Sequence, residues 1–333
     1  MSIYSINPKS KKLLRLIIKN NSPFMPNINT VSTSYPSLPK PQLYLQTFDT
    51  ETEQGSEIPI KSKLLDLEGT SQLILDNTIY ICGMNISSST VSGDEFTSSF
   101  LYSVNILSEP LLINFEVNAC YPHYFPTLAL LRNEYIIVIG GLNTKKCEYY
   151  SITSKLWKDL PILPELRYGA NAVSDNCNNH IYVFGGLNQQ TRKCAMSVFK
   201  LNMNLCLKWE TVVVMENADL LTKMCACVVK KEGGHIWIMG GEDEQGVPSD
   251  VIVDINLKDK VFKPKLLKKS LAKKTRFLSL RSGVTNEMNG SVYAMDDSLE
   301  SKYNIVYKID ESMSALIYID DEIIHNKNSI NKK

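Results

Sequence analysis

One short pattern recurs along the chain and constrains its fold more than any other feature. Each copy is a short apolar or aromatic run that ends at a glycine position. The copies are residues 79–83, 136–141, 181–186 and 236–241, with a weaker fifth copy at 292–297. The first glycine positions lie about 57, 45, 55 and 56 residues apart. Recurrence at this spacing indicates that the chain is built from equivalent units that pack on one another.

The composition of the runs predicts β-strands. Isoleucine, valine and aromatic residues predominate, and each run is too short for a stable helix. A glycine at the strand end adopts positive φ without steric cost and allows another segment to approach closely. After the second copy, Tyr150 and Trp157 flank a polar turn. This spacing predicts a hairpin with one aromatic residue on each arm. Hardly any stretch keeps a helical period, so we expect an all-β fold.

The paired glycines and the spaced tyrosine and tryptophan together resemble the kelch motif. The resemblance is strongest at residues 121–164 and weakest at 269–325, where Asp296 and Asp297 stand in the glycine positions. Met84 replaces the second glycine of the first copy. The resemblance implies an all-β, six-bladed kelch-type β-propeller whose blades are four-stranded antiparallel sheets.

The expected organisation is a single propeller over residues 1–325, followed by a polar tail at 326–333. The blades are expected at about 1–62, 63–118, 119–164, 165–215, 216–268 and 269–325. Residues 1–62 lack a glycine pair, and we interpret them as a degenerate first blade that closes against the last. Five blades completed by an N-terminal hairpin, or seven blades, are the alternatives.

Composition narrows the classes of partner and location. A formal net charge of +1 gives no whole-molecule field that would attract nucleic acid or an anionic membrane. No apolar run approaches the length of a membrane span, and the first residues mix charged with apolar side chains, unlike a signal peptide. The eight cysteines are scattered, as in reduced intracellular proteins. We expect a cytoplasmic protein without a nucleic-acid or membrane partner.

The residues that carry most enzyme chemistry are dispersed. His123, His180, His235 and His325 fall in different repeats or in the tail, and the chain has no C-x-x-C pair. This pattern is not that of a zinc site. Nucleotide-binding glycine motifs and the serine nucleophile motif are also missing from the sequence. The expectation is a protein that is not an enzyme and that uses no metal or other cofactor.

The kelch resemblance also implies a partner-binding site. In some kelch proteins, a residue two positions before the small residue that opens the innermost strand points into the channel mouth, where arginines hold acidic partners. Arg167 matches that position before Gly169. The remaining candidates are Lys223, Arg276 and Tyr124, by looser alignment, and the post-glycine residues Asn143 and Asn188. The basic segment 263–276 is a second candidate surface, for an acidic protein, RNA or lipid.

The expected function is therefore a non-enzymatic protein-interaction module, either a scaffold or a substrate-recognition subunit, that binds through loops at one face of the disc. Fold does not fix function, so this step rests on the resemblance. One alternative is a sugar-modifying enzyme like the kelch sialic-acid mutarotases, which need an arginine and a carboxylate at the channel. Another is a structural component of a cytoskeletal or ciliary assembly.

Overall fold

The computed structural model describes residues 12–19, 42–60, 69–84, 99–205, 208–214, 217–268, 270–271, 274, 284–285, 291–296, 304–309 and 314–319. Within these residues the protein is all-β. The helices found there are two short 3-10 helices, η2 (Ala218–Leu221) and η3 (Glu232–Gly234). No helix among the described residues is long and apolar enough to cross a membrane.

The described strands form five four-stranded sheets in which neighbouring strands pair antiparallel. The first contains β4 (Thr70–Leu75), β5 (Thr78–Gly83), β6 (Phe100–Asn105) and β7 (Asn114–Asn118). The second contains β8 (Thr127–Leu131), β9 (Tyr135–Ile139), β10 (Cys147–Ser151) and β11 (Leu156–Leu160). The third contains β13 (Asn171–Asp175), β14 (His180–Phe184), β17 (Val198–Asn202) and β18 (Trp209–Val212).

The remaining four-stranded sheets follow the same order along the chain. One contains β19 (Cys227–Lys230), β20 (His235–Met239), β21 (Ile252–Asn256) and β22 (Lys265–Leu266). The other contains β23 (Val284–Thr285), β24 (Val292–Asp296), β25 (Asn304–Ile309) and β26 (Ser314–Ile319). The weak fifth repeat copy is thus a strand with antiparallel neighbours, although aspartates replace its glycines.

Two smaller sheets complete the described structure. An N-terminal three-stranded sheet contains β1 (Lys12–Lys19), β2 (Gln42–Asp49) and β3 (Gln54–Pro59). A second three-stranded sheet is made of the short strands β12 (Arg167–Tyr168), β15 (Leu187–Asn188) and β16 (Lys193–Cys194). This small sheet joins the segment before β13 to the loop after β14.

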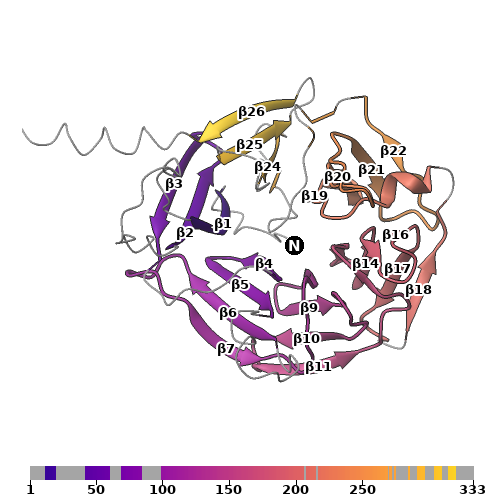
Figure 1. The fold of residues 1–333 in the computed structure, drawn as a ribbon, viewed down its shortest axis with the longest axis horizontal. Helices are drawn as coiled ribbons and strands as arrows, with labels where there is room; N and C mark the ends of the chain where they lie inside the picture. The colour runs from indigo at the N-terminus through magenta and orange to yellow at the C-terminus, as the bar shows by residue number, and fades with distance from the viewer. Residues whose placement is uncertain are drawn as a thin grey trace, which may run out of the picture.

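The five four-stranded sheets and the N-terminal sheet lie side by side in a ring (Figure 1). Strands β1 and β4 lie near the centre, and β7, β11, β18, β22 and β26 lie at the outer edge. Three apolar clusters join neighbouring sheets. One runs through the four sheets from β4 to β22. A second joins the β19–β22 sheet to the last sheet. The third joins the N-terminal sheet both to the β4–β7 sheet and to the last sheet.

The contact between the N-terminal sheet and the last sheet brings residues 240 or more positions apart in the chain together; we call it the first–last seam. The buried rings of Phe48 and Tyr293 lie with their centroids 5.9 Å apart. The Tyr293 hydroxyl donates to Glu53 Oε1 at 3.0 Å. The ammonium group of Lys308 also donates to Glu53. The seam therefore combines aromatic packing with an ion pair.

Hydrogen bonds also link successive inner strands. Ser71 Oγ donates to the carbonyl of Pro126, and Thr127 Oγ1 donates to the carbonyl of Ala170, both from buried side chains. Asn171 Nδ2 continues the series by donating to the carbonyl of Lys223 at 3.1 Å. Buried polar groups of this kind are costly unless paired, so each bond fixes one sheet against the next.

The predicted aromatic hairpin is confirmed. Tyr150 lies directly opposite Trp157 in the β10–β11 pair, and their rings are 5.2 Å apart. In the following repeat, the aromatic residues Phe199 and Trp209 do not face each other, because Phe199 lies opposite Thr211 and Trp209 lies opposite Leu201. Its indole Nε1 donates to the carbonyl of Pro161 in the preceding connection at 2.8 Å. Trp209 thus ties one sheet to its neighbour.

The second glycine of each pair is required by a close approach of the chain. Gly141 has φ of 129°, and a Cβ atom there would lie 2.6 Å from the carbonyl oxygen of Tyr124. Gly241 has φ of 87°, and a Cβ atom would lie 2.7 Å from the carbonyl oxygen of Met224. Real Cβ atoms do not approach so closely, so only glycine admits the segment that enters the inner strand.

Candidate functional site

Three equivalent connectors enter the inner strands β8, β13 and β19 at the end of the ring that carries the glycine pairs. We call this end the double-glycine face. Each connector has one residue with positive φ: Phe125 at 52°, Gly169 at 62° and Cys225 at 51°. The preceding residue pairs with the residue that follows the glycine pair, as Tyr124↔Leu142, Tyr168↔Leu187 and Met224↔Glu242. The residues immediately before Tyr124, Tyr168 and Met224 are His123, Arg167 and Lys223, respectively.

This equivalence corrects one sequence alignment. Tyr124 was aligned with Arg167, but the backbone pairing aligns Tyr124 with Tyr168 and places His123 opposite Arg167 in the repeat. The Tyr124 ring instead packs edge-on against Phe125, with the centroids 4.9 Å apart. The slip of one residue arose because Phe125, a bulky residue, stands at the positive-φ position where glycine is expected.

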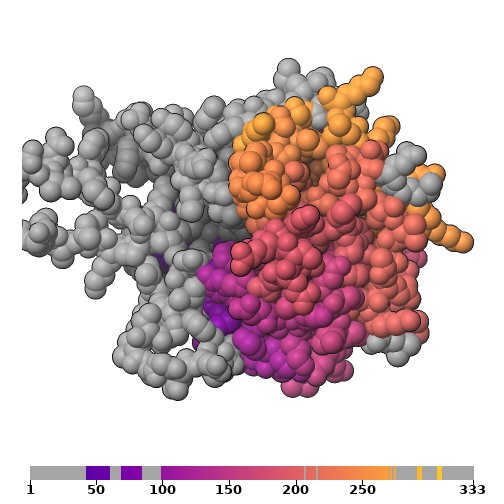
Figure 2. All heavy atoms as spheres, turned by 45° about the vertical axis from the view of Figure 1, so that its right-hand side comes forward, coloured from indigo at the N-terminus to yellow at the C-terminus, as the bar shows by residue number. Residues whose placement is uncertain are grey.

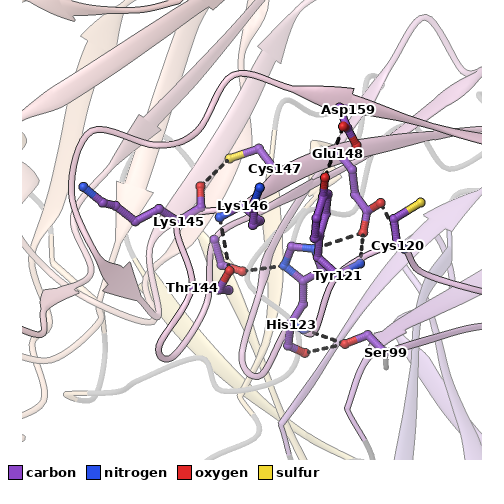
Figure 3. Close-up of polar contacts among 11 residues, drawn as sticks. Ser99, Cys120, Tyr121, His123, Thr144, Lys145, Lys146, Cys147, Glu148 and Asp159 are labelled. Carbon is purple, nitrogen blue, oxygen red and sulfur yellow. Dashed lines mark hydrogen bonds and ion pairs between the residues drawn. The ribbon is translucent and has the colours of Figure 1, made fainter. Parts of the chain in front are cut away.

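His123 fills the space beneath the glycine pair of its own repeat (Figure 3). Its ring is fully buried, with Nδ1 2.8 Å from the carbonyl oxygen of Gly140 and Nε2 3.1 Å from Glu148 Oε1. Both ring nitrogens face oxygen atoms, so polar contacts hold the ring on two sides. The buried Glu148 also accepts hydrogen bonds from the backbone N–H groups of Cys120 and Tyr121.

Arg167 fills the equivalent space in the next repeat, and its side chain has no solvent exposure. Nη1 donates to the carbonyl of Gly185 at 3.3 Å and to that of Ser197 at 3.0 Å. Nη2 donates to Glu165 Oε2 at 2.8 Å and to Ser197 Oγ at 2.6 Å. The guanidinium stacks over the Phe199 ring, 4.7 Å from its centroid. Arg167 is thus held on several sides by its own repeat.

The Arg167–Glu165 pair is electrostatically matched. Burial would raise the pKa of Glu165, but hydrogen bonds from Ser197 and the charge of Arg167 outweigh burial and lower the pKa. Burial lowers the pKa of Arg167, while Glu165 opposes that change. An arginine in this environment keeps its proton at neutral pH. With the guanidinium enclosed, Arg167 does not present its charge to a partner at a channel mouth, contrary to the sequence-based hypothesis.

Lys223 occupies the third equivalent position, and there the space is open. A cavity of about 430 Å³, which we call the Lys223 cavity, lies between η2 and the loop after β20. It is lined by residues from η2 to Lys223, from the glycine turn and its loop, and from β20 and β21: Asp219, Leu220, Thr222, Lys223, Ile238, Gly240, Asp243, Glu244, Gln245, Ser249, Val251 and Val253. Its volume is within the range of small-ligand pockets.

Carboxylates outnumber cations around the Lys223 cavity. Asp219, Asp243 and Glu244 line it together with the single ammonium group of Lys223. Backbone N–H groups of Val247 and Gln245, together with the charge of Lys223, lower the pKa of Asp243. A backbone hydrogen bond and the thiol of Cys194 lower the pKa of Glu244. Both side chains are therefore anionic at neutral pH, so carboxylate charges outnumber ammonium charges among the residues that line the cavity.

Asn143 and Asn188, the other predicted site residues that the structure describes, contact neighbouring loops and Glu165. Asn143 is exposed and exchanges hydrogen bonds with Gln189 of the next loop, at 2.8 and 3.0 Å. Asn188 lies opposite Arg167 in the small sheet and donates to Glu165 Oε2 at 3.2 Å. The structure therefore brings Asn188 and Arg167 together, through Glu165. Arg276 and four more residues of the basic segment 263–276 lie outside the described residues.

Two large apolar side chains are exposed in the loops of the double-glycine face. Met196 is 63% exposed in the loop before β17, and Val247 is 50% exposed in the loop after β20. The two loops lie near each other, because Glu244 raises the pKa of the Cys194 thiol. In Figure 2, residues of the range 119–268 form one continuous surface, coloured from magenta to orange. Exposed apolar groups beside a charged cavity are typical of binding surfaces.

Comparison with known proteins identifies the fold and no closer family. No protein-family model matches the chain, and no curated protein sequence matches it. The solved structure of YjhT superposes with a TM-score of 0.52 at 12% sequence identity, over 78% of this chain and 99% of YjhT. The chain has a kelch-like β-propeller fold. At this level of identity, the likeness describes the fold alone.

The propeller contains functional groups that the sequence did not reveal. His123 was judged by its distance from the other histidines, which hid its pairing with Glu148, 25 residues away. Asp243 and Glu244, in the loop after β20, line a cavity that no sequence motif indicates. The backbone pairing of the connectors, rather than the sequence alignment, places Lys223 where the other repeats have His123 and Arg167. Among the described residues, no group of three potential metal ligands lies together.

Proposed function

We propose that the chain forms one closed six-bladed propeller that binds a protein partner at its double-glycine face. Five four-stranded sheets and the N-terminal three-stranded sheet lie around the ring in chain order, an arrangement that supports six blades. The first–last seam supports closure, because Phe48 and Glu53 of the first sheet contact Tyr293 and Lys308 of the last. A closed ring leaves no free blade face at either end.

The observation that carries the binding proposal is the surface made by Met196, Val247 and the Lys223 cavity. These residues lie in loops, which can change without affecting the packing of the sheets. Apolar side chains of this size bury substantial area when a partner covers them, and a nearby charged cavity gives the contact its specificity. The combination favours a protein-binding surface over a purely structural face.

The test is a double variant, Met196→Asp with Val247→Asp, compared with wild type by affinity purification and quantitative mass spectrometry. We expect at least one partner to fall about tenfold or more, since a charge in a buried apolar contact opposes binding. The control is Leu107→Asp, which changes a side chain that is 70% exposed. Leu107 follows β6, and the antiparallel order places that turn at the opposite end of the ring. The same partners at the same levels in all three samples would rule out this surface.

A second candidate is the mutarotase type of activity that the kelch resemblance left open. The Arg167–Glu165 pair favours it, because it sets an arginine beside a carboxylate that keeps 29% side-chain exposure. The enclosed guanidinium is less suited to a sugar than to a structural role. NMR measurement of the anomeric exchange of sialic acid separates the two. We expect no acceleration over the uncatalysed exchange; acceleration that Glu165→Gln removes would establish the enzymatic function instead.

A further inference from the structure

The propeller repeats one small socket beneath its glycine pairs. Each socket is bounded by the carbonyl of the first glycine, by the residue before the third strand of the sheet, and by a residue on that strand. Backbone bonds fix the equivalence, since Gly140 N donates to Lys146 O and Gly240 N donates to Val251 O. The strand residues Glu148, Phe199 and Val253 correspond in the same register.

Two of the sockets hold a positively charged or protonatable side chain of their own repeat. The His123 ring reaches the Gly140 carbonyl and Glu148, and the Arg167 guanidinium reaches the Gly185 carbonyl and stacks on Phe199. A carboxylate lies beside each of them: Glu148 Oε1 is 3.1 Å from His123 Nε2, and Glu165 Oε2 is 2.8 Å from Arg167 Nη2. The same backbone geometry thus receives a nitrogen-bearing side chain twice. Carbonyl and carboxylate oxygens pointing into one space are what a multidentate N–H donor requires.

The third socket is the Lys223 cavity. Three residues that line this cavity, Gly240, Val251 and Val253, are the equivalents of Gly185, Ser197 and Phe199 in the preceding repeat. Val253 is smaller than Phe199, so it leaves space in the socket. Val251 lacks the hydroxyl group of Ser197, so it cannot accept a hydrogen bond from a side chain in the socket. The carboxylates remain, now from the loop and η2, as Asp219, Asp243 and Glu244.

We propose that the Lys223 cavity binds an arginine side chain supplied by the protein partner, in the place that Arg167 occupies in the preceding repeat. This inference rests on the proposed function and names the chemistry of its partner. The apolar walls formed by Leu220, Ile238 and Val251 accommodate the methylene stem of the arginine. Asp243 and Glu244 at the cavity receive the guanidinium, whose planar fork pairs with carboxylates. The partner is therefore basic at this contact, whereas the sequence favoured an acidic partner.

The inference is tested with a small probe, N-acetyl-arginine methylamide, titrated into the full-length protein and followed by NMR or calorimetry. The isosteric citrulline derivative, which has no charge, is the matched control ligand. We expect the arginine probe to bind and the citrulline probe to bind about tenfold or more weakly, because only the cation pairs with the carboxylates. Equal affinity for the two probes, or no binding of either, overturns the proposal.

Lys223→Arg provides the matched protein variant. Its longer guanidinium should occupy the socket from within, as Arg167 does, and weaken the arginine probe about tenfold or more while the protein stays folded. Lys258→Arg makes the same chemical change at an exposed position outside the cavity and should leave binding unchanged. Unaltered probe binding in Lys223→Arg would place the probe elsewhere and contradict the socket.

The two proposals fail in different ways. If the Met196→Asp, Val247→Asp variant loses its partner while the arginine probe never binds, the double-glycine face is a partner surface and the arginine socket is wrong. If the probe binds in the cavity and no partner depends on this face, the cavity recognises guanidinium groups, and the proposal of a protein partner is wrong. Partner loss in Lys223→Arg together with probe binding in wild type supports both.

Discussion

Replacing Arg167 with alanine is expected to lower the free energy of unfolding by about 3–5 kcal/mol, the usual cost of removing one partner of a buried ion pair. The guanidinium makes four hydrogen bonds, to Glu165, Gly185 and twice to Ser197. It also stacks on Phe199. Its removal leaves carbonyl oxygens without donors, a carboxylate without its cation and a space in the core, each of which is destabilising.

Denaturant unfolding of wild type and three variants measures this effect. Arg167→Lys keeps the charge but loses the planar fork, so an intermediate loss is expected. Lys158→Ala, at an exposed position on β11, should change stability by less than about 0.5 kcal/mol. A loss below about 1 kcal/mol in Arg167→Ala would mean that the guanidinium is solvated. That result would support the partner-binding role that the sequence predicts for Arg167.

The repeat could be predicted from sequence because its determinants are local. The run at residues 136–141 becomes β9 and its glycine pair, and Gly141 is required where Tyr124 approaches. Tyr150 and Trp157 form the expected cross-strand pair because a short polar turn sets their register. Strand propensity, turn length and glycine conformation all act within a few residues.

The fate of the charged connector residues could not be predicted, because it depends on distant partners. Arg167 is enclosed by Ser197, which is 30 residues away, and by Phe199 on the same strand. His123 is fixed by Glu148 across a whole hairpin. A repeat motif indicates roughly which connector positions are equivalent, but whether each side chain points inward or to a partner depends on residues that the motif does not specify.

The Lys223 cavity illustrates the same limit. The difference between a filled and an open socket lies in Val251 and Val253, which take the places of Ser197 and Phe199. These positions align only once the strand register is known, since the loops between glycine pair and strand differ in length. Sequence similarity to a family therefore predicts the fold well and its binding chemistry poorly.

Closure of the ring is tested at the first–last seam, where Phe48→Ala should cost about 3–5 kcal/mol, as truncation of a buried aromatic residue does. Phe48 has no solvent exposure and packs against the equally buried Tyr293. Ile58→Ala, on β3 of the same sheet but with 42% exposure, is the control and should cost less than about 1 kcal/mol.

A double-mutant cycle distinguishes loss of the seam from general loss of core packing. If the sheets meet as proposed, Phe48→Ala and Tyr293→Ala should be coupled by about 0.5–1.5 kcal/mol, the range for aromatic pairs in contact. Phe48→Leu and Tyr293→Phe give a milder cycle in case the alanine variants do not fold. The Tyr293→Phe change also removes the hydrogen bond to Glu53. Because these residues are 245 positions apart, their coupling requires the first and last sheets to touch in solution, and purely additive effects would mean that the ring is open there.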